Sequence, residues 1–147
     1  MVEPVWDIIP FRKLRNAVKD PLVIVRRAAC EAMARLDSVP SPALSALVEA
    51  LNDRDLSVSR AATEALLKVA DYEGVVSLLA KLGDAAASPE VRAVVAGALA
   101  RAGEPDYDVG MVDRALAQAS EDPHPTVRAA AIRALGRRLM LYQMAGR

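Results

Sequence analysis

The stretch DPLVIVRRAACEAMARL, residues 20–36, decides the fold of this chain. It opens with Asp20-Pro21, which ends one helix and begins the next, and its apolar residues from Val25 onward fall on one face at helical spacing. Similar segments start at three later positions: VSRAATEAL from 58, VRAVVAGAL from 91 and VRAAAIRAL from 127. The intervals between the four are 33, 33 and 36 residues. A repeat of this length indicates a solenoid of stacked helical units.

Each repeat is expected to be an A helix and a B helix joined by a short turn, and no strand pattern competes. The predicted fold is all-α, a right-handed α-solenoid of about four antiparallel helix pairs. We expect one domain over residues 1–147, with an N-terminal cap or arm (1–9), repeats at about 10–37, 41–70, 71–103 and 106–138, and a C-terminal helix extension (139–147). The third A helix is expected to start at Asp71, and the fourth near Asp106 or Asp108.

Equivalent positions of the four B helices should form the core. The predicted buried residues are Val25, Ala29, Val58, Ala62, Val91, Val95, Val127 and Ala131.

Composition excludes several classes of protein. Hydrophobic residues make up 53% and charged residues 26%, so the chain is globular, and only 3% aromatic residues argue against a large β core. Basic and acidic residues balance at 19 each, so no overall charge points to nucleic acid or a membrane. A single cysteine, Cys30, fits a reducing compartment, and no apolar run is long enough to span a membrane. These features predict a cytoplasmic protein.

The B-helix motif Asp-x-x-x-x-Val-Arg-x-x-Ala-x-x-Ala-Leu resembles that of HEAT-like repeats, especially the short bacterial kind also found in phycobilin lyase subunits. The fourth repeat carries it most fully, at Asp122, Val127, Arg128, Ala131, Ala134 and Leu135. The resemblance spans roughly residues 10–138. It implies a bacterial-type protein that binds other macromolecules.

The resemblance also implies a ladder of charged hydrogen bonds between the motif Asp and Arg of neighbouring repeats. The Asp occurs at Asp20, Asp53 and Asp122, and the Arg at Arg26, Arg92 and Arg128. The third Asp is replaced by Ala86 and the second Arg by Ser59, with Arg60 one residue late. We therefore expect Arg92 to reach Asp53 of the preceding repeat, and Arg128 to lack a partner because residue 86 is alanine.

Little in the sequence could carry chemistry. A catalytic triad needs a base, and the one histidine, His124, lies between prolines in a turn. One Cys and one His do not make a structural zinc site, and there is no Gly-rich phosphate loop. We expect no catalytic residue, no metal site, no cofactor and no enzyme activity of the chain alone.

Two alternatives come from relatives with similar repeats. HEAT-like DNA glycosylases use aromatic residues on the inner face, whereas here Trp6 precedes the repeats and no B helix carries an aromatic before Tyr142. Phycobilin lyase subunits suggest a non-catalytic member of a modifying complex. Both alternatives stay open beside a protein-binding scaffold.

Stacking aligns equivalent B-helix positions in columns on the concave face. The columns read Arg27, Arg60, Ala93 and Ala129; Glu31, Glu64, Gly97 and Arg133; and Arg35, Lys68, Arg101 and Arg137. The third column is basic in every repeat, and Arg138 is expected to extend it. Two interpretations stay open: these cations serve the helix C-termini, or they meet an acidic partner or a phosphate backbone.

Both ends of the chain are apolar, whereas solenoids usually end in polar caps. Trp6 at the start and Leu139, Met140 and Tyr142 at the end are therefore predicted contacts with a second chain, either another copy or a different protein. The predicted function is a non-enzymatic scaffold that binds a protein through the concave B-helix face or an apolar end, with nucleic acid less expected and no membrane contact.

Overall fold

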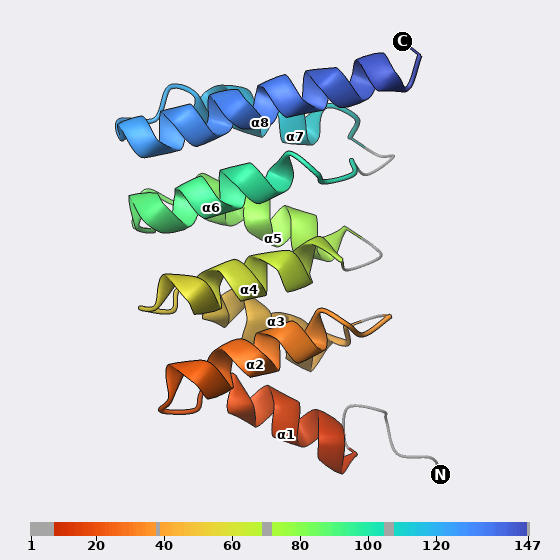
Figure 1. Cartoon of the computed structure of the whole chain (residues 1–147), viewed down its shortest axis with the longest axis vertical. Helices are drawn as coiled ribbons and strands as arrows, with labels where there is room; N and C mark the ends of the chain where they lie inside the picture. Colours follow the sequence, from red (N-terminus) through yellow and green to blue (C-terminus); the bar gives the residue numbers. More distant parts are fainter. Residues whose placement is uncertain (1–7, 38, 69–71, 105–107, 147) are drawn as a thin grey trace. The chain divides into compact units, whose positions relative to one another are not determined.

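The computed structural model describes residues 8–37, 39–68, 72–104 and 108–146, and these residues form helices and turns without strands. Figure 1 shows the helices in chain order. Their bounds are α1 Ile9–Ala17, α2 Val23–Met33, α3 Ser41–Ala50, α4 Leu56–Leu67, α5 Glu73–Leu82, α6 Pro89–Leu99, α7 Met111–Ala119 and α8 Pro125–Met144. No helix among the described residues is long and apolar enough to cross a membrane.

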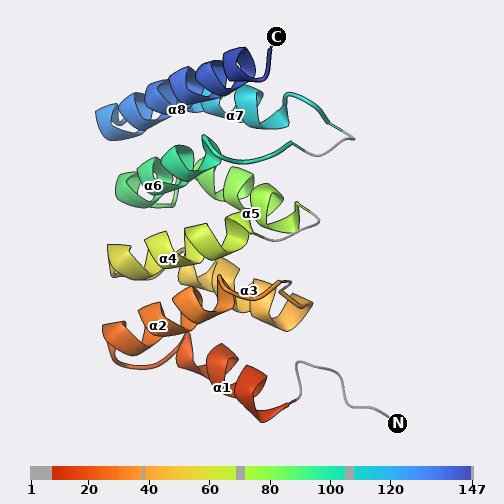
Figure 2. The same ribbon diagram turned by 45° about the vertical axis from the view of Figure 1, so that its right-hand side comes forward.

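The helices pair as predicted, with an odd-numbered A helix followed by an even-numbered B helix, and the chain groups into two compact units. Unit 1 is Met1–Ala70 and unit 2 is Asp71–Arg147. Within unit 1, α1 packs on α3 and α2 packs on α4; within unit 2, α5 packs on α7 and α6 packs on α8. Each unit is therefore two stacked repeats, with A helices in one layer and B helices in the other (Figures 1 and 2).

The predicted core register is confirmed at seven of eight positions, which are all buried: Ala29, Val58, Ala62, Val91, Val95, Val127 and Ala131. Val25 is only half-buried, so this prediction is wrong. The equivalent Val58 is fully covered and lies on α4, which follows α2 in the stack, whereas α2 has no B helix before it among the described residues.

The Arg–Asp ladder runs in the opposite direction to the one predicted. In unit 1, Arg26 Nε and Nη2 donate to the two carboxylate oxygens of Asp53 at 2.7 and 3.1 Å. In unit 2, Arg92 Nη2 donates to Asp122 Oδ1 at 3.1 Å. Each arginine thus reaches the Asp of the following repeat, and the expected Arg92–Asp53 pair is wrong. Arg128 has no carboxylate partner among the described residues, and the reason expected for this, alanine at residue 86, is wrong because the ladder runs toward the following repeat.

The residue after the motif valine also holds the turn between the A and B helices. Arg26 Nη1 donates to the carbonyls of Asp20 and Pro21 at 2.9 and 3.1 Å. The residues at the same position of the later repeats make the same kind of contact. Ser59 donates to the carbonyls of Leu51 and Asp53, Arg92 to that of Ala87, and Arg128 to those of Asp122 and Pro123. Buried turn carbonyls need such partners, so the smaller Ser59 keeps this half of the arginine's role.

The third A–B turn has its Asp two residues earlier than the motif requires. Asp84 Oδ1 accepts from the Ala86 N–H at 2.9 Å. Asp20 and Asp53 make the same contact with the residue two positions on. The turn-forming role of the Asp is therefore kept at Asp84, although Ala86 occupies the motif position.

The last A helix, α7, is capped by a residue that lies outside the helix and before it in the chain. α7 begins at Met111, after Gly110 with a φ of 95°, rather than at Asp108. The Glu104 carboxylate accepts from the N–H groups of Gly110 and Val112 at 2.7 and 3.1 Å. A negative charge at these free N–H groups also complements the helix dipole. The two other predicted starts, Asp71 and Asp106, lie outside the described residues.

Candidate interaction surfaces

The predicted columns form a shallow groove on unit 1. It has a volume of about 530 Å³ and runs between α2 and α4. The residues lining it are Arg27, Glu31, Ala34, Arg35, Ser57, Arg60, Ala61, Glu64 and Lys68. All six predicted candidates from these two helices therefore line one groove.

Most of the cations of this groove are not used to hold the fold. Arg27 and Glu31 lie 3.6 Å apart, with both side chains about half exposed, so their attraction is weakened by water. Arg35, Arg60 and Lys68 are exposed and contact no carboxylate or hydrogen-bond acceptor among the described residues. Their charges are available to a ligand of unit 1.

The equivalent surface of unit 2 is basic and carries no acidic residue at the column positions. Arg133 and Arg137 of α8 are exposed and have no partner in the described part of the chain. Their counterparts on α6 are Gly97 and Arg101, both exposed. A Cβ added to Gly97 would meet no atom within 4 Å, so the surface beside it is open.

Arg138 does not extend the basic column, and this prediction is wrong. Its side chain is only 6% exposed and pairs with Glu104 at 3.4 Å and with Asp113. Nη1 donates to the Leu99 and Ala102 carbonyls at 3.3 and 2.9 Å. The guanidinium therefore ties α8 to α7 and to the end of α6.

Tyr142 belongs to the same network, which corrects its assignment as a free apolar contact. Its hydroxyl donates to Asp113 Oδ2 at 2.6 Å and accepts from Arg138 Nη2 at 3.0 Å. Burial alone would raise the pKa of Asp113, but hydrogen bonds from Tyr142 and Arg138 and the Arg138 charge bring it below its usual value. No sequence pattern points to this cluster, because Asp113 lies far from Arg138 and Tyr142 in the chain.

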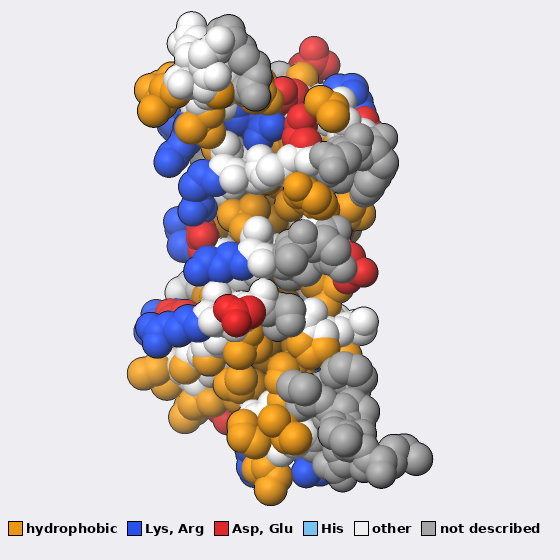
Figure 3. Space-filling view, turned by 90° about the vertical axis from the view of Figure 1, so that its right-hand side faces the viewer, with side chains coloured by type: hydrophobic (Ala, Val, Ile, Leu, Met, Phe, Trp, Pro, Cys, Tyr) orange, Lys and Arg blue, Asp and Glu red, His pale blue; other side chains and the backbone are white. Residues whose placement is uncertain are grey.

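The other residues of the C-terminal helix are exposed as predicted. Leu139 and Met140 are 58% and 60% exposed, and Leu141 and Met144 are exposed as well. Figure 3 shows orange hydrophobic side chains over α8 at its upper left. Trp6, the predicted contact at the other end, lies outside the described residues.

Comparison with known families agrees with the geometry. The family model described as HEAT repeats matches residues 11–100 and 76–140, which is nearly the whole described chain. The chain belongs to the HEAT-repeat family. A search of the curated proteins finds no match. HEAT repeats commonly serve as protein-interaction scaffolds, so the exposed B-helix surfaces are the first place to look for a binding site.

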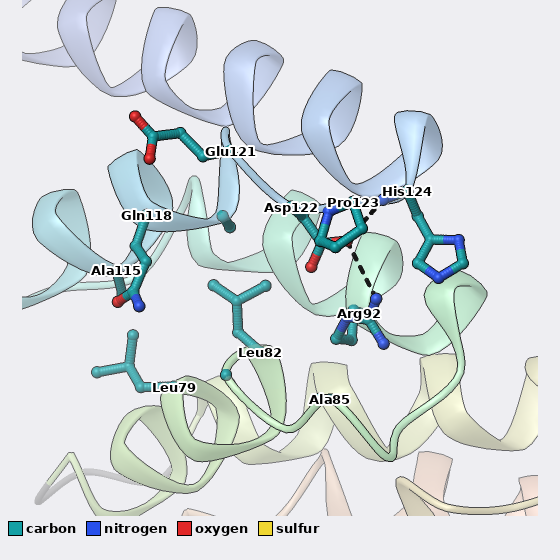
Figure 4. A pocket seen from close by; sticks show the side chains of 12 residues that line it. Leu79, Leu82, Ala85, Arg92, Ala115, Gln118, Glu121, Asp122, Pro123 and His124 are labelled. Atoms are coloured by element: carbon teal, nitrogen blue, oxygen red, sulfur yellow. Dashed lines mark hydrogen bonds and ion pairs between the residues drawn. The ribbon is translucent and has the colours of Figure 1, made fainter.

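A second hollow of the HEAT repeats, absent from the sequence predictions, lies on unit 2 beside the last A–B turn. It has a volume of about 460 Å³ and is lined from α5, α6, α7 and this turn. Figure 4 shows Arg92, Asp122 and His124 together at one end and Gln118 at the other. A hydrogen bond from the His124 N–H, with help from Arg92, lowers the pKa of Asp122. The polar groups Arg92 and Asp122 that line this hollow are therefore already engaged in the ladder pair and in the last A–B turn.

The remaining reactive groups are poorly placed for chemistry. Cys30 is fully buried, and burial raises the pKa of its thiol to about 11, so little thiolate forms at neutral pH. Among the described residues, no cluster of three or more His, Cys, Asp and Glu side chains could hold a metal ion.

Proposed function

We propose that this HEAT-repeat protein is a binding module without catalytic activity of its own, which holds an acidic segment of another protein against its B helices. The proposal rests on exposed cations of the B-helix faces, which are Arg35, Arg60 and Lys68 in unit 1 and Arg133 and Arg137 in unit 2. In contrast, the buried arginines Arg26, Arg92 and Arg138 are each fixed by carboxylates and carbonyls.

The position of Arg137 is the observation that carries the proposal. Arg35, Lys68 and Arg101 lie at or just after the C-terminal ends of α2, α4 and α6, where a cation complements the helix dipole. Arg137 occupies the same repeat position, but α8 continues to Met144. The dipole effect is confined to the last turn, so it does not explain an arginine in the helix interior. A ligand that binds this face of unit 2 does explain it.

The chemistry of this surface favours an acidic protein segment. α8 carries four arginines and no acidic residue. Arg133 and Arg137 are four residues apart and therefore lie on the same side of the helix. Guanidinium groups bind carboxylates through paired hydrogen bonds, and small residues such as Gly97 let a peptide backbone come close.

The test compares two double charge reversals on the immobilised protein. Arg133→Glu/Arg137→Glu changes the B-helix face of unit 2, and Arg12→Glu/Lys13→Glu makes the same change in charge at exposed positions of the A helix α1. We expect a protein captured from host extract by the wild type and the α1 variant to be lost from the α8 variant. Equal capture by all three would contradict binding at this face.

The same variants separate the alternatives. Retention on immobilised DNA that falls steeply with salt and is lost only in the α8 variant would favour nucleic-acid binding, since phosphate contacts release counterions. A visible absorbance band after mixing with a bilin would favour a subunit of a lyase-type complex.

A further inference from the structure

The stacking within each unit shows which side of a B helix faces the next repeat. In unit 1, Arg26 and Cys30 lie on the side of α2 that α4 covers, and they are 5% and 0% exposed. In unit 2, Arg92 and Ala96 hold the same positions on α6 under α8, and they are 4% and 0% exposed. This side of a B helix is thus normally buried by the following repeat.

The corresponding side of α8 is open. Ile132 is in register with Cys30 and Ala96, yet it is 58% exposed. Arg128 and Gly136 on the same side are exposed too, and a Cβ added to Gly136 would meet no atom within 4 Å. No described element covers this surface, which we call the forward face of α8.

Arg128 on the forward face is half of a ladder pair. Its Nη1 donates to the carbonyls of Asp122 and Pro123 at 2.8 and 2.9 Å, just as Arg26 holds its own turn. Arg26 uses its remaining N–H groups to bind Asp53, but Arg128 contacts no carboxylate among the described residues. The guanidinium is therefore already oriented by its turn, with donors left for an aspartate.

A carboxylate that could complete the ladder pair of Arg128 lies in the first repeat. Asp20 is the motif Asp of the first repeat, and its carboxylate accepts only the Leu22 N–H, at 2.9 Å, among the described groups. Its counterparts Asp53 and Asp122 each bind the arginine of the repeat before them. Asp20 thus lacks the cation that its counterparts have.

Apolar residues beside Asp20 are open in the same way. Val25 and Ala32 on α2 are half-buried, whereas their equivalents are almost fully covered: Val58 and Ala65 on α4, and Val127 and Ala134 on α8. Ala28 on the same side is exposed. We call this surface, with Asp20, the rear face of α2.

We infer that the forward face of α8 binds the rear face of α2 of a second copy of this chain, head to tail, with Arg128 of one copy paired to Asp20 of the next. The two faces have the charges, the register and the small apolar residues that join repeats inside each unit. This contact lies on other surfaces than the B-helix columns and does not depend on the function proposed above. Because the two faces differ, the contact is heterologous and builds rings or filaments rather than a symmetric dimer.

The inference is tested by exchanging the two charges and measuring mass by light scattering. The wild-type chain of 15.7 kDa should show a weight-average mass that rises with concentration to at least about twofold. Arg128→Asp alone and Asp20→Arg alone each bring like charges together, so each variant should stay monomeric. An equimolar mixture of the two restores an opposite pair at every contact and should regain the mass of the wild type.

Two further variants keep the test decisive. Glu121→Arg makes the same change as Asp20→Arg at an exposed residue outside both faces and should associate like the wild type. Ile132→Glu leaves both ladder charges in place but puts a carboxylate on the forward face, and it should abolish association. A wild-type monomer at every concentration, a mixture of folded variants that stays monomeric, or an Ile132→Glu chain that still associates would each overturn the inference.

Discussion

Each buried arginine in the described part of the chain has two jobs, since it holds turn or helix-end carbonyls and also binds a carboxylate. Arg26 makes two bonds to Asp53 and two to its own turn. Arg92 binds Asp122 through one nitrogen, and its buried Nε has no partner among the described groups. The Arg26–Asp53 pair should therefore tolerate mutation less than the Arg92–Asp122 pair.

Substitution of Asp53 by alanine should lower the free energy of unfolding by more than the loss of an exposed ion pair does, because it leaves the Arg26 guanidinium without its counter-ion. The matched control is Glu49→Ala, which breaks the exposed pair with Lys19. That change should cost less than about 1 kcal/mol. Urea denaturation of both variants measures the difference, and equal losses would contradict the structural role of the ladder.

Acid should weaken unit 2 through Asp113. Its pKa is lowered in the folded state, so its contribution to stability is complete above the ordinary value of 3.8 and is lost as the pH falls through the lower folded value. Between about pH 4 and pH 2, the wild type should lose more stability than Asp113→Asn, which has no carboxylate to protonate. Denaturation curves across this range give the slopes, and parallel slopes would contradict the assignment.

At the scale of the element, the start of α7 depends on a residue outside the helix. Glu104→Ala should speed hydrogen exchange of the Gly110 and Val112 amides, because both lose the carboxylate that accepts them. Asp108→Ala is the control, since Asp108 pairs with the exposed Arg114 instead of capping the helix. Unchanged exchange in Glu104→Ala, or equal effects of the two variants, would show that the cap is elsewhere.

The glycines inside B helices weaken these helices without filling a packing need. Gly97 and Gly136 have open space where a Cβ would lie, and glycine costs about 1 kcal/mol relative to alanine in a helix interior. Gly97→Ala should therefore raise the free energy of unfolding by about 0.5–1 kcal/mol. Thermal melting measures the gain. A loss of stability would show that Gly97 is covered in the folded protein.

The element scale also shows what a sequence period can and cannot predict. Apolar spacing fixed the B helices and their buried sides, because packing against a neighbour demands it at Val58, Val91 and Val127 alike. The period could not choose between Asp53 and Asp122 as the partner of Arg92, since both are in register with it. Nor could it find Glu104, whose capping contacts lie outside the repeated motif.

At the scale of the whole molecule, a chain of stacked repeats gains stability from contacts between neighbours, so its two terminal faces are special. Soluble repeat arrays normally carry polar residues there. Here the forward face of α8 keeps Ile132 and Arg128 exposed, and the rear face of α2 keeps Ala28 exposed and Asp20 half-buried. The residues that join repeats inside each unit are thus present, unpaired, at both ends of the described chain.

Cross-linking between two labelled pools tests this complementarity most directly. One pool carries Ala28→Cys on the rear face and the other carries Gly136→Cys on the forward face, and neither change touches Asp20 or Arg128. The native Cys30 is buried and its thiol pKa is about 11, so a short bismaleimide should react at the new cysteines. Head-to-tail packing predicts a covalent dimer with one chain from each pool in the mixture and none in either pool alone. A dimer formed within a single pool, or none in the mixture, would contradict it.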